Sequence, residues 1–582
     1  MSRLFKYFEG YRAKIVFGSL FKLFEACLEL TLPVIMATLI NNAFGVQTKI
    51  GGYVIPLTTT QCIVLLSVFI IAGFGFAVCA QYFAAVGSMG FGGKLRSALF
   101  KHIFSLSNRE IEALGTESYV NRLTNDVNQI QLAVAMFVRL IFRAPVLCVG
   151  ALIMAFLIDT KIAIIFAVSI PIVSLVLFLI MKRTIPMHKK VQSDLDRIGV
   201  VTRENLTGAR VIRAFSGQDK EIDRGIAATE NYYQSSVKVN KLSAAMNPLT
   251  ALIMNLSIAV IVIAGAHRVA GGHITPAEIS AFVTYILWLL LALTIIANIS
   301  VLITRALASA DRVSEILQLN SSVADEGLIR ETPQTEDTLK FENVFFRYND
   351  TEYILKDISF AMQKGETIGI IGGTGSGKST LAALIARFYD AERGAITLNG
   401  EDIKSYPLDV LRHKVAVVMQ NSTLFKGSLR ENIALGDENP NDNHIIDCLK
   451  AAAAWEFVKK LKDGLDTAVL AGGRNFSGGQ LQRLTIARAL YRRAEILILD
   501  DSSSALDFAT DARLRKNLAK IAKHTNVIVI SQRVGTVRQS DKIIVLDKGR
   551  IAGIGAHKEL LETSPIYREI CLTQFKEDEL NG

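Results

Sequence analysis

A glycine-rich loop that ends in a lysine and a serine carries the clearest chemistry in the sequence. Apolar residues 367–371 predict a buried strand, and the loop leads from that strand into a predicted helix over residues 380–388. Glycines let successive backbone N–H groups converge on phosphate oxygens at the positive end of a helix. We therefore expect this loop to hold the phosphates of a nucleotide, with Lys378 on the β- and γ-phosphates and Ser379 on Mg²⁺. The expected phosphate ligands are Gly372, Gly373, Thr374, Gly375, Ser376, Gly377, Lys378, Ser379 and Thr380.

Two further features fit a nucleotide site. Residues 496–500 read as a buried strand that ends in Asp500, and such a carboxylate can hold Mg²⁺ through water. Tyr348, upstream of the loop, is placed to stack on an adenine, although a tyrosine that only packs in a strand is the alternative. The short apolar runs that alternate with helical segments after residue 338 predict an α/β domain.

Between these two motifs the sequence reads Ser477-Gly478-Gly479-Gln480. This tetrapeptide resembles the signature of ATP-binding-cassette (ABC) proteins, and the resemblance extends over essentially the whole chain. It implies ATP and Mg²⁺ as cofactors, with Gln420 in the loop that contacts Mg²⁺ and with Asp507, of the motif Ser504-Ala505-Leu506-Asp507, as a further nucleotide-binding residue. Cassettes of this family pair head to tail. The resemblance therefore implies that Ser477, Gly478, Gly479 and Gln480 contact ATP held by a partner chain.

The sequence departs from the family pattern at the catalytic positions. Family members that hydrolyse ATP carry a glutamate directly after the strand carboxylate, where this chain has Asp501, and a histidine where it has Gln532. Asp501 taken alone is open to interpretation as neutral sequence drift with no functional consequence. Together the two changes remove water activation and its γ-phosphate partner, and they predict binding without efficient turnover. A further departure is Leu470–Gly473, where the family usually offers an acidic residue.

The first half of the chain is built for a membrane. Of the 582 residues 50% are hydrophobic, and long uncharged runs exclude an ordinary soluble enzyme. Six spanning helices fit these runs, although the third includes Arg139 and Arg143. Their predicted ranges are about 15–44, 57–86, 133–158, 161–182, 244–266 and 279–304.

The basic residues fix the expected orientation. Residues 1–320 carry 29 Lys and Arg against 18 Asp and Glu, whereas residues 321–582 carry 35 against 36. Of the 29, 23 fall on one side of the six helices and three on the other, which predicts a multi-pass protein with both termini in the cytoplasm. That the membrane is the cell (inner) membrane is implied by the family resemblance alone. The excess of basic residues therefore reflects the orientation of the chain in the membrane, and we expect no nucleic-acid partner.

The two long connections, 86–131 and 182–243, keep a helical apolar spacing and should continue the membrane helices into the cytoplasm as rods. The expected fold is an α-helical six-span membrane domain with long cytoplasmic helical extensions, fused to an α/β P-loop ATP-binding cassette. We place the membrane domain at 1–317, a polar linker at 318–338 and the cassette at 339–582. Short coupling helices that seat on cassettes are expected near 121–126 and 208–215, by resemblance.

Charges and aromatics inside the membrane half leave alternatives open. Lys22 and Glu25 either form an intrahelical pair or face a cavity, and Glu29 is a candidate attraction point for cationic substrates. Arg139 and Arg143 are expected to snorkel or to pair with phospholipid headgroups. Phe282, Tyr285 and Trp288 are read either as helix packing or, with a slight preference, as a wall on which drugs stack. The six cysteines, which show no C-x-x-C, are expected to be reduced and buried.

These observations predict one half of an ATP-driven exporter. By resemblance to the degenerate-site subunit of heterodimeric bacterial multidrug exporters, we expect multidrug efflux, with hydrophobic or cationic amphipathic molecules as substrates and a second half-transporter as partner. The assembled dimer would be the ATP-hydrolysing translocase. A homodimeric lipid flippase or peptide exporter is the alternative within transport, and an ATP-gated regulatory or channel protein is the alternative from another class.

Overall fold

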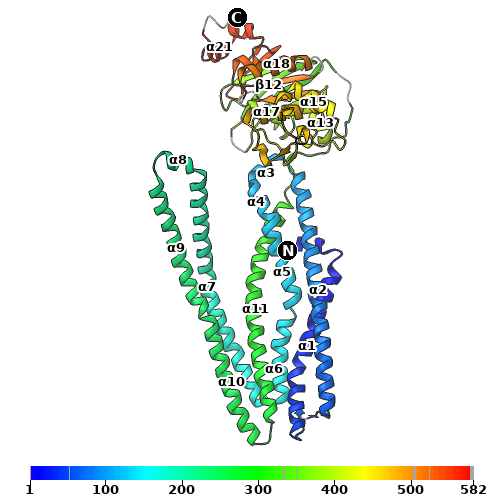
Figure 1. Cartoon of the computed structure of the whole chain (residues 1–582), viewed down its shortest axis with the longest axis vertical. Helices are drawn as coiled ribbons and strands as arrows, with labels where there is room; N and C mark the ends of the chain where they lie inside the picture. Colours follow the sequence, from blue (N-terminus) through cyan, green and yellow to red (C-terminus); the bar gives the residue numbers. More distant parts are fainter. Residues whose placement is uncertain are drawn as a thin grey trace. The chain divides into compact units, whose positions relative to one another are not determined.

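The computed structural model describes residues 2–51, 53–331, 335–349, 352–502, 506–522 and 525–576. These residues form two compact units (Figure 1). Unit 1 comprises Met1–Ile103 and Glu117–Gln318, and unit 2 comprises Phe104–Thr116 and Leu319–Gly582. Residues 104–116, which the sequence assigned to the membrane domain, thus pack with the second half of the chain.

Unit 1 is helical. Among the described residues, six helical stretches are long and apolar enough to cross a membrane, as the sequence predicted. Single helices make four of them: α1 (Arg12–Ala43), α2 (Thr59–Ser105), α7 (Thr160–Thr207) and α11 (Pro276–Ile316). Each of the other two is built from several elements in series. One comprises α4 (Thr116–Asn121), a π-helical turn (Arg122–Asp126), α5 (Val127–Leu140) and α6 (Arg143–Ile158), and the other comprises α9 (Gln218–Ala244) and α10 (Met246–Ala270).

Local signals set the helix starts. The side chain of Asp159 accepts hydrogen bonds from the backbone N–H groups of Lys161 (2.9 Å) and Ile162 (3.1 Å), so that one residue ends α6 and caps α7. Thr275 and Glu278 form a capping box at the start of α11. The third predicted span, 133–158, lies within the stretch Thr116–Ile158 and is confirmed, with two turn residues, 141 and 142, between α5 and α6.

Several helices extend far beyond their apolar parts. The 48-residue α7 packs along α9, and the short helix α8 (Ala209–Ala214) joins the two at the tip of this hairpin (Figure 1). These helices are the rods that the sequence predicted.

Aromatic side chains of α11 lie in the core of the helical bundle. Phe282 and Tyr285 are fully buried, and the Tyr285 hydroxyl donates a hydrogen bond to the Leu30 carbonyl at 2.6 Å. Phe166 of α7 contacts Phe282 with ring centroids 6.0 Å apart. Helix packing accounts for both residues in this conformation, so the preference for a drug-stacking wall is not supported; Trp288 beside them is half-buried.

Four of the charged side chains that the sequence placed in the bundle form two ion pairs, namely Lys22 with Glu25 and Arg143 with Glu29. Lys22 Nζ lies 2.7 Å from Glu25 Oε1, which realises the intrahelical pair that the sequence left as one alternative. Arg143 donates to Glu29 at 2.8 Å, so the expectation that this arginine pairs with lipid was wrong. A long side chain on α6 reaches α1 because the two helices are neighbours, which no local pattern reveals. The pair also neutralises Glu29.

All six cysteines are free thiols, but the expectation that they are buried was only partly right. Cys62, Cys448 and Cys571 are buried, and Cys148 is half-buried. Cys27 and Cys79 are exposed on apolar helices, because a helix that faces lipid needs no protein cover for an apolar thiol.

Unit 2 contains two main sheets. Its six-stranded sheet has the order β14-β13-β5-β12-β11-β8 and is parallel except for β14. Its four-stranded sheet is antiparallel, with the order β4-β3-β6-β7. The first sheet comprises β5 (Thr367–Gly372), β8 (Val415–Val418), β11 (Ile496–Asp500), β12 (Asn526–Ile530), β13 (Lys542–Asp547) and β14 (Arg550–Gly555). The second comprises β3 (Asp337–Phe346), β4 (Leu355–Gln363), β6 (Arg393–Leu398) and β7 (Glu401–Asp402).

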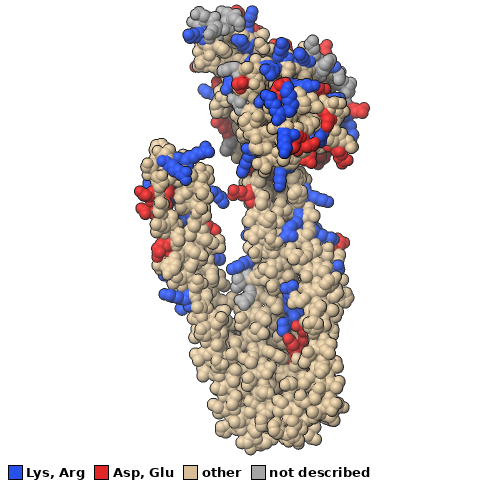
Figure 2. All heavy atoms as spheres, in the orientation of Figure 1, with Lys and Arg blue, Asp and Glu red and all other residues tan. Residues whose placement is uncertain are grey.

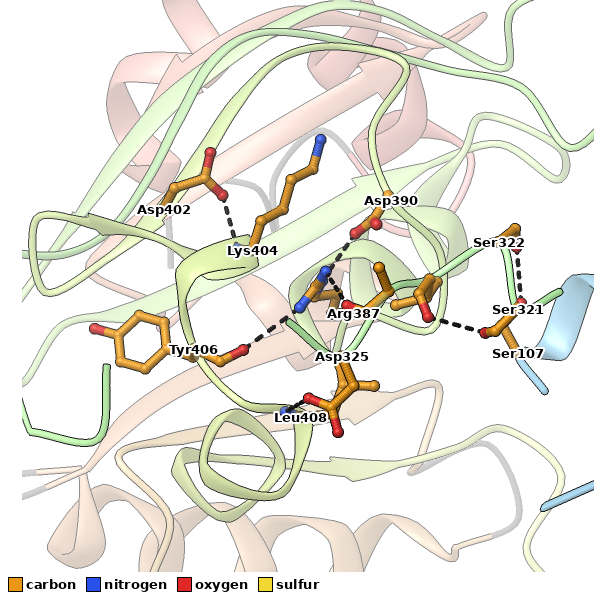
Figure 3. A network of polar contacts seen from close by, with 12 residues as sticks. Ser107, Ser321, Ser322, Asp325, Arg387, Asp390, Asp402, Lys404, Tyr406 and Leu408 are labelled. Atoms are coloured by element: carbon orange, nitrogen blue, oxygen red, sulfur yellow. Dashed lines mark hydrogen bonds and ion pairs between the residues drawn. The ribbon is translucent and has the colours of Figure 1, made fainter. Parts of the chain in front are cut away.

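The segment 319–331, expected as part of a linker, is fastened to unit 2. Arg387, which is only 2% exposed, donates to the carbonyl of Ala324 at 2.8 Å and to Asp390 at 2.9 Å (Figure 3). A Cβ at Gly327 would lie 2.1 Å from the carbonyl carbon of Tyr406, so only glycine permits this approach. We call residues 319–331 the strap; the rest of the predicted linker includes residues 332–334, which lie outside the described residues.

The strap also holds the segment 104–116. The Ser107 and Ser322 hydroxyls are 2.8 Å apart, and they join the helix α3 (Asn108–Leu114) to the start of the strap (Figure 3). A polar sequence therefore forms a fixed connection, because backbone and side-chain groups of the strap find partners on unit 2.

Candidate active site

The phosphate loop connects β5 to α12 (Lys378–Ile385), as predicted. Two of its glycines, Gly372 and Gly377, are required by space or by backbone angle. A Cβ at Gly372 would lie 2.2 Å from the Leu546 carbonyl oxygen, and Gly377 has φ +101° with a Cβ position 2.6 Å from Leu355. The loop can therefore bend tightly and present its backbone to a ligand.

Lys378 lies across this loop. Its ammonium donates hydrogen bonds to the carbonyls of Gly372 (2.9 Å) and Gly373 (2.7 Å). Burial lowers the pKa of Lys378, while the nearby carboxylates of Asp500 and Asp501 raise it. A buried cation that faces two carboxylates is suited to an anionic ligand that brings its own metal ion.

The structure brings the predicted magnesium ligands together. Ser379 donates a hydrogen bond to Asp500 at 3.1 Å, because α12 starts beside the carboxyl ends of the parallel strands. Burial raises the pKa of Asp500, and the Ser379 hydrogen bond opposes the shift. A hydroxyl, a carboxylate and the side-chain amide of Gln420 are hard oxygen donors of the kind that Mg²⁺ prefers, so these residues fit the ion.

A cavity of about 390 Å³ collects these groups. Its lining includes residues of the phosphate loop and also Asp501 and Gln532, the two positions at which the sequence departs from its family. The residues that line it include Thr374, Gly375, Gly377, Lys378, Ser379, Thr380, Gln420, Asp500, Asp501, Ser531 and Gln532. Gly372, Gly373 and Ser376 belong to the same loop and accept hydrogen bonds from the Lys378 ammonium.

Asp501 occupies an unusual backbone position at the end of β11. Its φ is +46°, and its N–H donates to the Ile530 carbonyl at 2.9 Å, which fixes the residue beside β12. Its carboxylate accepts a long hydrogen bond of 3.4 Å from the Gln420 side chain. Burial raises its pKa, and Arg533, Lys378 and Gln420 lower it. Gln532 is exposed and lines the same cavity.

The predicted signature lies apart from this lining. Ser477 caps α17 (Gly478–Tyr491), and the Gln480 side chain accepts from the Ser477 N–H at 3.0 Å. Ser477 and Gly478 are exposed, and Gly479 is half-buried, so a helix end with unsatisfied N–H groups faces outward. Asp507 is also exposed and caps α18 (Phe508–Ile521) by accepting from Thr510 at 2.9 Å; Ser504 and Ala505 lie outside the described residues.

Tyr348 packs in an aromatic cluster. Its ring meets those of Phe346 and Tyr389 edge-on, at centroid distances of 4.9 and 5.0 Å, and its hydroxyl lies 3.1 Å from that of Thr380. It lines a second cavity of about 280 Å³ together with Tyr389 and Arg109. Adenine stacking remains a prediction.

Sequence reasoning missed Tyr389 and its partner. The Tyr389 hydroxyl donates to Glu112 of α3 at 2.9 Å, and burial, followed by this bond, raises the tyrosine pKa. The two residues are 277 positions apart in the chain, so the sequence contains no local signal for this contact.

Comparisons with known proteins place this geometry in a family. Residues 15–293 match the family of the ABC transporter transmembrane region, and residues 355–504 match the ABC transporter family. An uncharacterized ABC transporter ATP-binding protein of Mycobacterium tuberculosis (strain H37Rv) is 32% identical, with 99% of this chain and 98% of that protein covered. The chain belongs to the ABC transporter family. Its fusion of membrane helices to a nucleotide-binding α/β domain is that of an ABC exporter half-transporter, as the sequence predicted.

Further comparisons give two more relatives of this ABC transporter and one solved structure. The uncharacterized ABC transporter ATP-binding protein YfiB of Bacillus subtilis is 32% identical over 99% of both chains. An ATP-dependent lipid A-core flippase of Hahella chejuensis is 30% identical over 88% of both. The structure of a bacterial Atm1-family ABC exporter with ATP bound superimposes with a TM-score of 0.80 at 25% identity, covering 97% of this chain and 99% of that one.

Proposed function

We propose that this ABC exporter subunit binds Mg²⁺ and ATP at its own site, hydrolyses the nucleotide poorly there, and completes the active site of a different partner subunit with its signature. One observation carries the proposal: Asp501 and Gln532 line the same cavity as Lys378, Ser379 and Asp500. The groups that hold nucleotide are all present. The two substituted positions are those that act on water and γ-phosphate in hydrolysing relatives.

The chemistry of the two side chains supports slow turnover. Asp501 is one methylene shorter than glutamate, which draws the carboxylate back by roughly 1 Å, and such a displacement can cost on the order of 10²-fold in rate. Gln532 can donate a hydrogen bond but cannot carry a proton or a charge. Lys378 and the loop N–H groups would still neutralise and orient the phosphates, so binding is preserved.

Exposed features support an assembly with a second half-transporter. The open end of α17 at Ser477 offers N–H groups to a nucleotide held elsewhere, as the family's head-to-tail pairing requires. At the tip of the α7–α9 hairpin, the side chains of Leu206, Val211 and Phe215 are 75%, 61% and 82% exposed. Such apolar residues on a polar tip fit a seat on a partner's cassette.

We further propose export of amphipathic, drug-like molecules from the cell (inner) membrane, with both chain termini in the cytoplasm. The distribution of basic residues supports this orientation. Arg143 compensates the charge of Glu29 in an ion pair, so a preference for cations does not follow from that residue. A homodimeric lipid flippase is the second candidate, and the lipid A-core flippases among the relatives favour it.

Nucleotide retention tests the proposal. The purified full chain, reconstituted without a partner in lipid nanodiscs, should retain ATP in the presence of Mg²⁺ and release little ADP. Lys378→Ala gives the background for binding. Turnover at the rate of an ordinary exporter by the chain alone would exclude a degenerate site. Affinity purification from native membranes separates the candidates, since a one-to-one complex with a second half-transporter supports the heterodimer and a complex of this chain alone supports the flippase.

A further inference from the structure

A concave, basic and aromatic surface lies where the start of the chain meets α2. Its cavity measures about 540 Å³, and Tyr7, Tyr11, Lys94, Ser97 and Lys101 contribute to its lining. We call it the N-terminal pocket. All of its residues belong to unit 1, and none belongs to the nucleotide site.

The start of the chain is firmly packed on α2. Leu4 is 1% exposed, and the ring of Phe8 stacks on that of Phe91, with centroids 4.1 Å apart and planes 14° apart. The short 3-10 helix Ser2–Phe8 therefore has a fixed position against α2. One wall of the pocket is formed by this segment and the other by α2.

Two glycines of α2 shape the pocket in opposite ways. A Cβ at Gly90 would lie 2.1 Å from Cε1 of Tyr11, so this glycine lets the tyrosine ring lie directly on the helix. One turn later, a Cβ at Gly93 would meet nothing within 4 Å. The missing side chain at Gly93 leaves the floor of the pocket open, although glycine inside a helix is destabilising relative to alanine.

The charge around the pocket is positive. Lys94 donates to the Glu9 carbonyl at 2.8 Å, and its ammonium lies 5.6 Å from the centre of the Tyr11 ring. Lys14 approaches the same ring at 5.4 Å. Among the described residues that line the pocket there are two lysines and no carboxylate, so the charge fits an anion.

Lys94, Ser97 and Lys101 lie on one face of α2, at i, i+3 and i+7. Together with the tyrosine hydroxyls they offer several donors to one anionic group.

The position along α2 indicates where that anion comes from. Residues 59–93 contain no charged side chain, and Lys94 is the first. On the face of unit 1 that Figure 2 shows, the apolar part carries few charged side chains, and most Lys and Arg lie beyond it. Met89 and Phe100, on either side of Lys94, are 64% and 53% exposed. The pocket thus lies at the boundary of the apolar span, where lipid phosphates lie.

We propose that the N-terminal pocket binds the phosphate headgroup of an anionic phospholipid, with Lys94 and Lys101 as its cations and the lipid tails along the apolar side of α2. A juxtamembrane lysine attracts anionic lipid, and the fixed cavity adds a shape that a loose basic segment lacks. The inference goes beyond the proposed function and does not depend on the activity of the nucleotide site.

Two pairs of matched variants test the pocket in the full-length protein. Gly93→Leu fills the cavity, and Gly75→Leu on the same helix is its control, because a Cβ there also meets nothing within 4 Å. Lys94→Gln with Lys101→Gln removes two charges seven residues apart. Lys182→Gln with Lys189→Gln removes two exposed charges at the same spacing on α7.

The readout is binding of tail-labelled phosphatidylglycerol to detergent-solubilised protein, with phosphatidylcholine and inorganic phosphate as competitors. We expect Gly93→Leu to weaken binding at least ten-fold, the Lys94/Lys101 variant to weaken it at least five-fold, and both controls to bind within two-fold of wild type. Phosphatidylcholine and millimolar phosphate should compete weakly. Unchanged binding by Gly93→Leu would overturn the pocket, because it would leave only general surface charge. Full displacement by inorganic phosphate would assign the site to a free anion and refute the lipid.

Discussion

Restoring the two catalytic positions is the most direct perturbation of the nucleotide site. Asp501→Glu returns the missing methylene, and Gln532→His returns a group that can carry a proton. Both residues line the same cavity as Lys378, and Asp501 is held at the end of β11 by its N–H bond to the Ile530 carbonyl. The longer side chain should therefore extend into the cavity without a shift of the backbone.

The expected magnitude follows from that displacement. A carboxylate misplaced by roughly 1 Å costs on the order of 10²-fold, which corresponds to about 2.7 kcal/mol of activation free energy. We expect Asp501→Glu alone to recover most of this factor. Gln532→His should add about ten-fold more, but only together with the glutamate, because both groups act on the same water and γ-phosphate.

Single-turnover hydrolysis by the full chain in nanodiscs, with protein in excess over ATP, measures these rates. Lys378→Ala supplies the background, and Asp501→Asn tests whether the native carboxylate already acts. If Asp501 is withdrawn, its asparagine variant should slow hydrolysis by less than about three-fold. A loss of about 10²-fold in Asp501→Asn, or no gain in Asp501→Glu, would refute the reasoning.

Three further predictions address the strap, the metal carboxylate and the hairpin tip. Arg387→Met should remove the hydrogen bonds to Ala324 and Asp390 and destabilise unit 2 by on the order of 3 kcal/mol. It should also speed amide exchange at Leu328 and Ile329. Arg330→Met, which breaks the exposed 3.9 Å pair with Asp409, is the control and should change neither the stability of unit 2 nor the exchange rates. Because burial raises the pKa of Asp500, folding stability should fall as pH rises from the ordinary carboxyl pKa through the raised one. Asp500→Asn should therefore raise the melting temperature at neutral pH while abolishing Mg²⁺-dependent ATP binding, and a lower melting temperature there would contradict the assigned shift. Phe215→Asp should leave ATP binding unchanged and abolish transport of a reporter dye into vesicles, whereas unimpaired transport would show that the exposed tip does not seat on a partner.

Local patterns predicted much of this molecule. The six spans follow from uncharged runs whose length matches a bilayer. The phosphate loop follows from glycines at fixed spacing between a strand and a helix, and the Ser379–Asp500 contact follows from parallel strands whose carboxyl ends meet at one edge. These features depend on neighbours in sequence or on a sheet rule that applies across folds.

Contacts between distant segments were outside the reach of such patterns. Glu29 was read as an isolated intramembrane charge, but Arg143 of another helix neutralises it. Tyr285 was open to a role in substrate stacking, yet its hydroxyl meets the carbonyl of Leu30 in the core. The strap looked like a polar linker, because its main partner, Arg387, is 63 residues from Ala324.

The sequence by itself determined which segments span the membrane, which residues face phosphate and metal, and which two catalytic side chains differ from their family. Periodicity, charge and short motifs encode these properties, and each acts over a few residues. Only the tertiary structure decided which charges neutralise one another, which aromatics are core, and where Tyr11, just before α1, and Gly93 of α2 leave a pocket. The physical reason is that pairing and cavities depend on the packing of helices whose mutual positions no local pattern specifies.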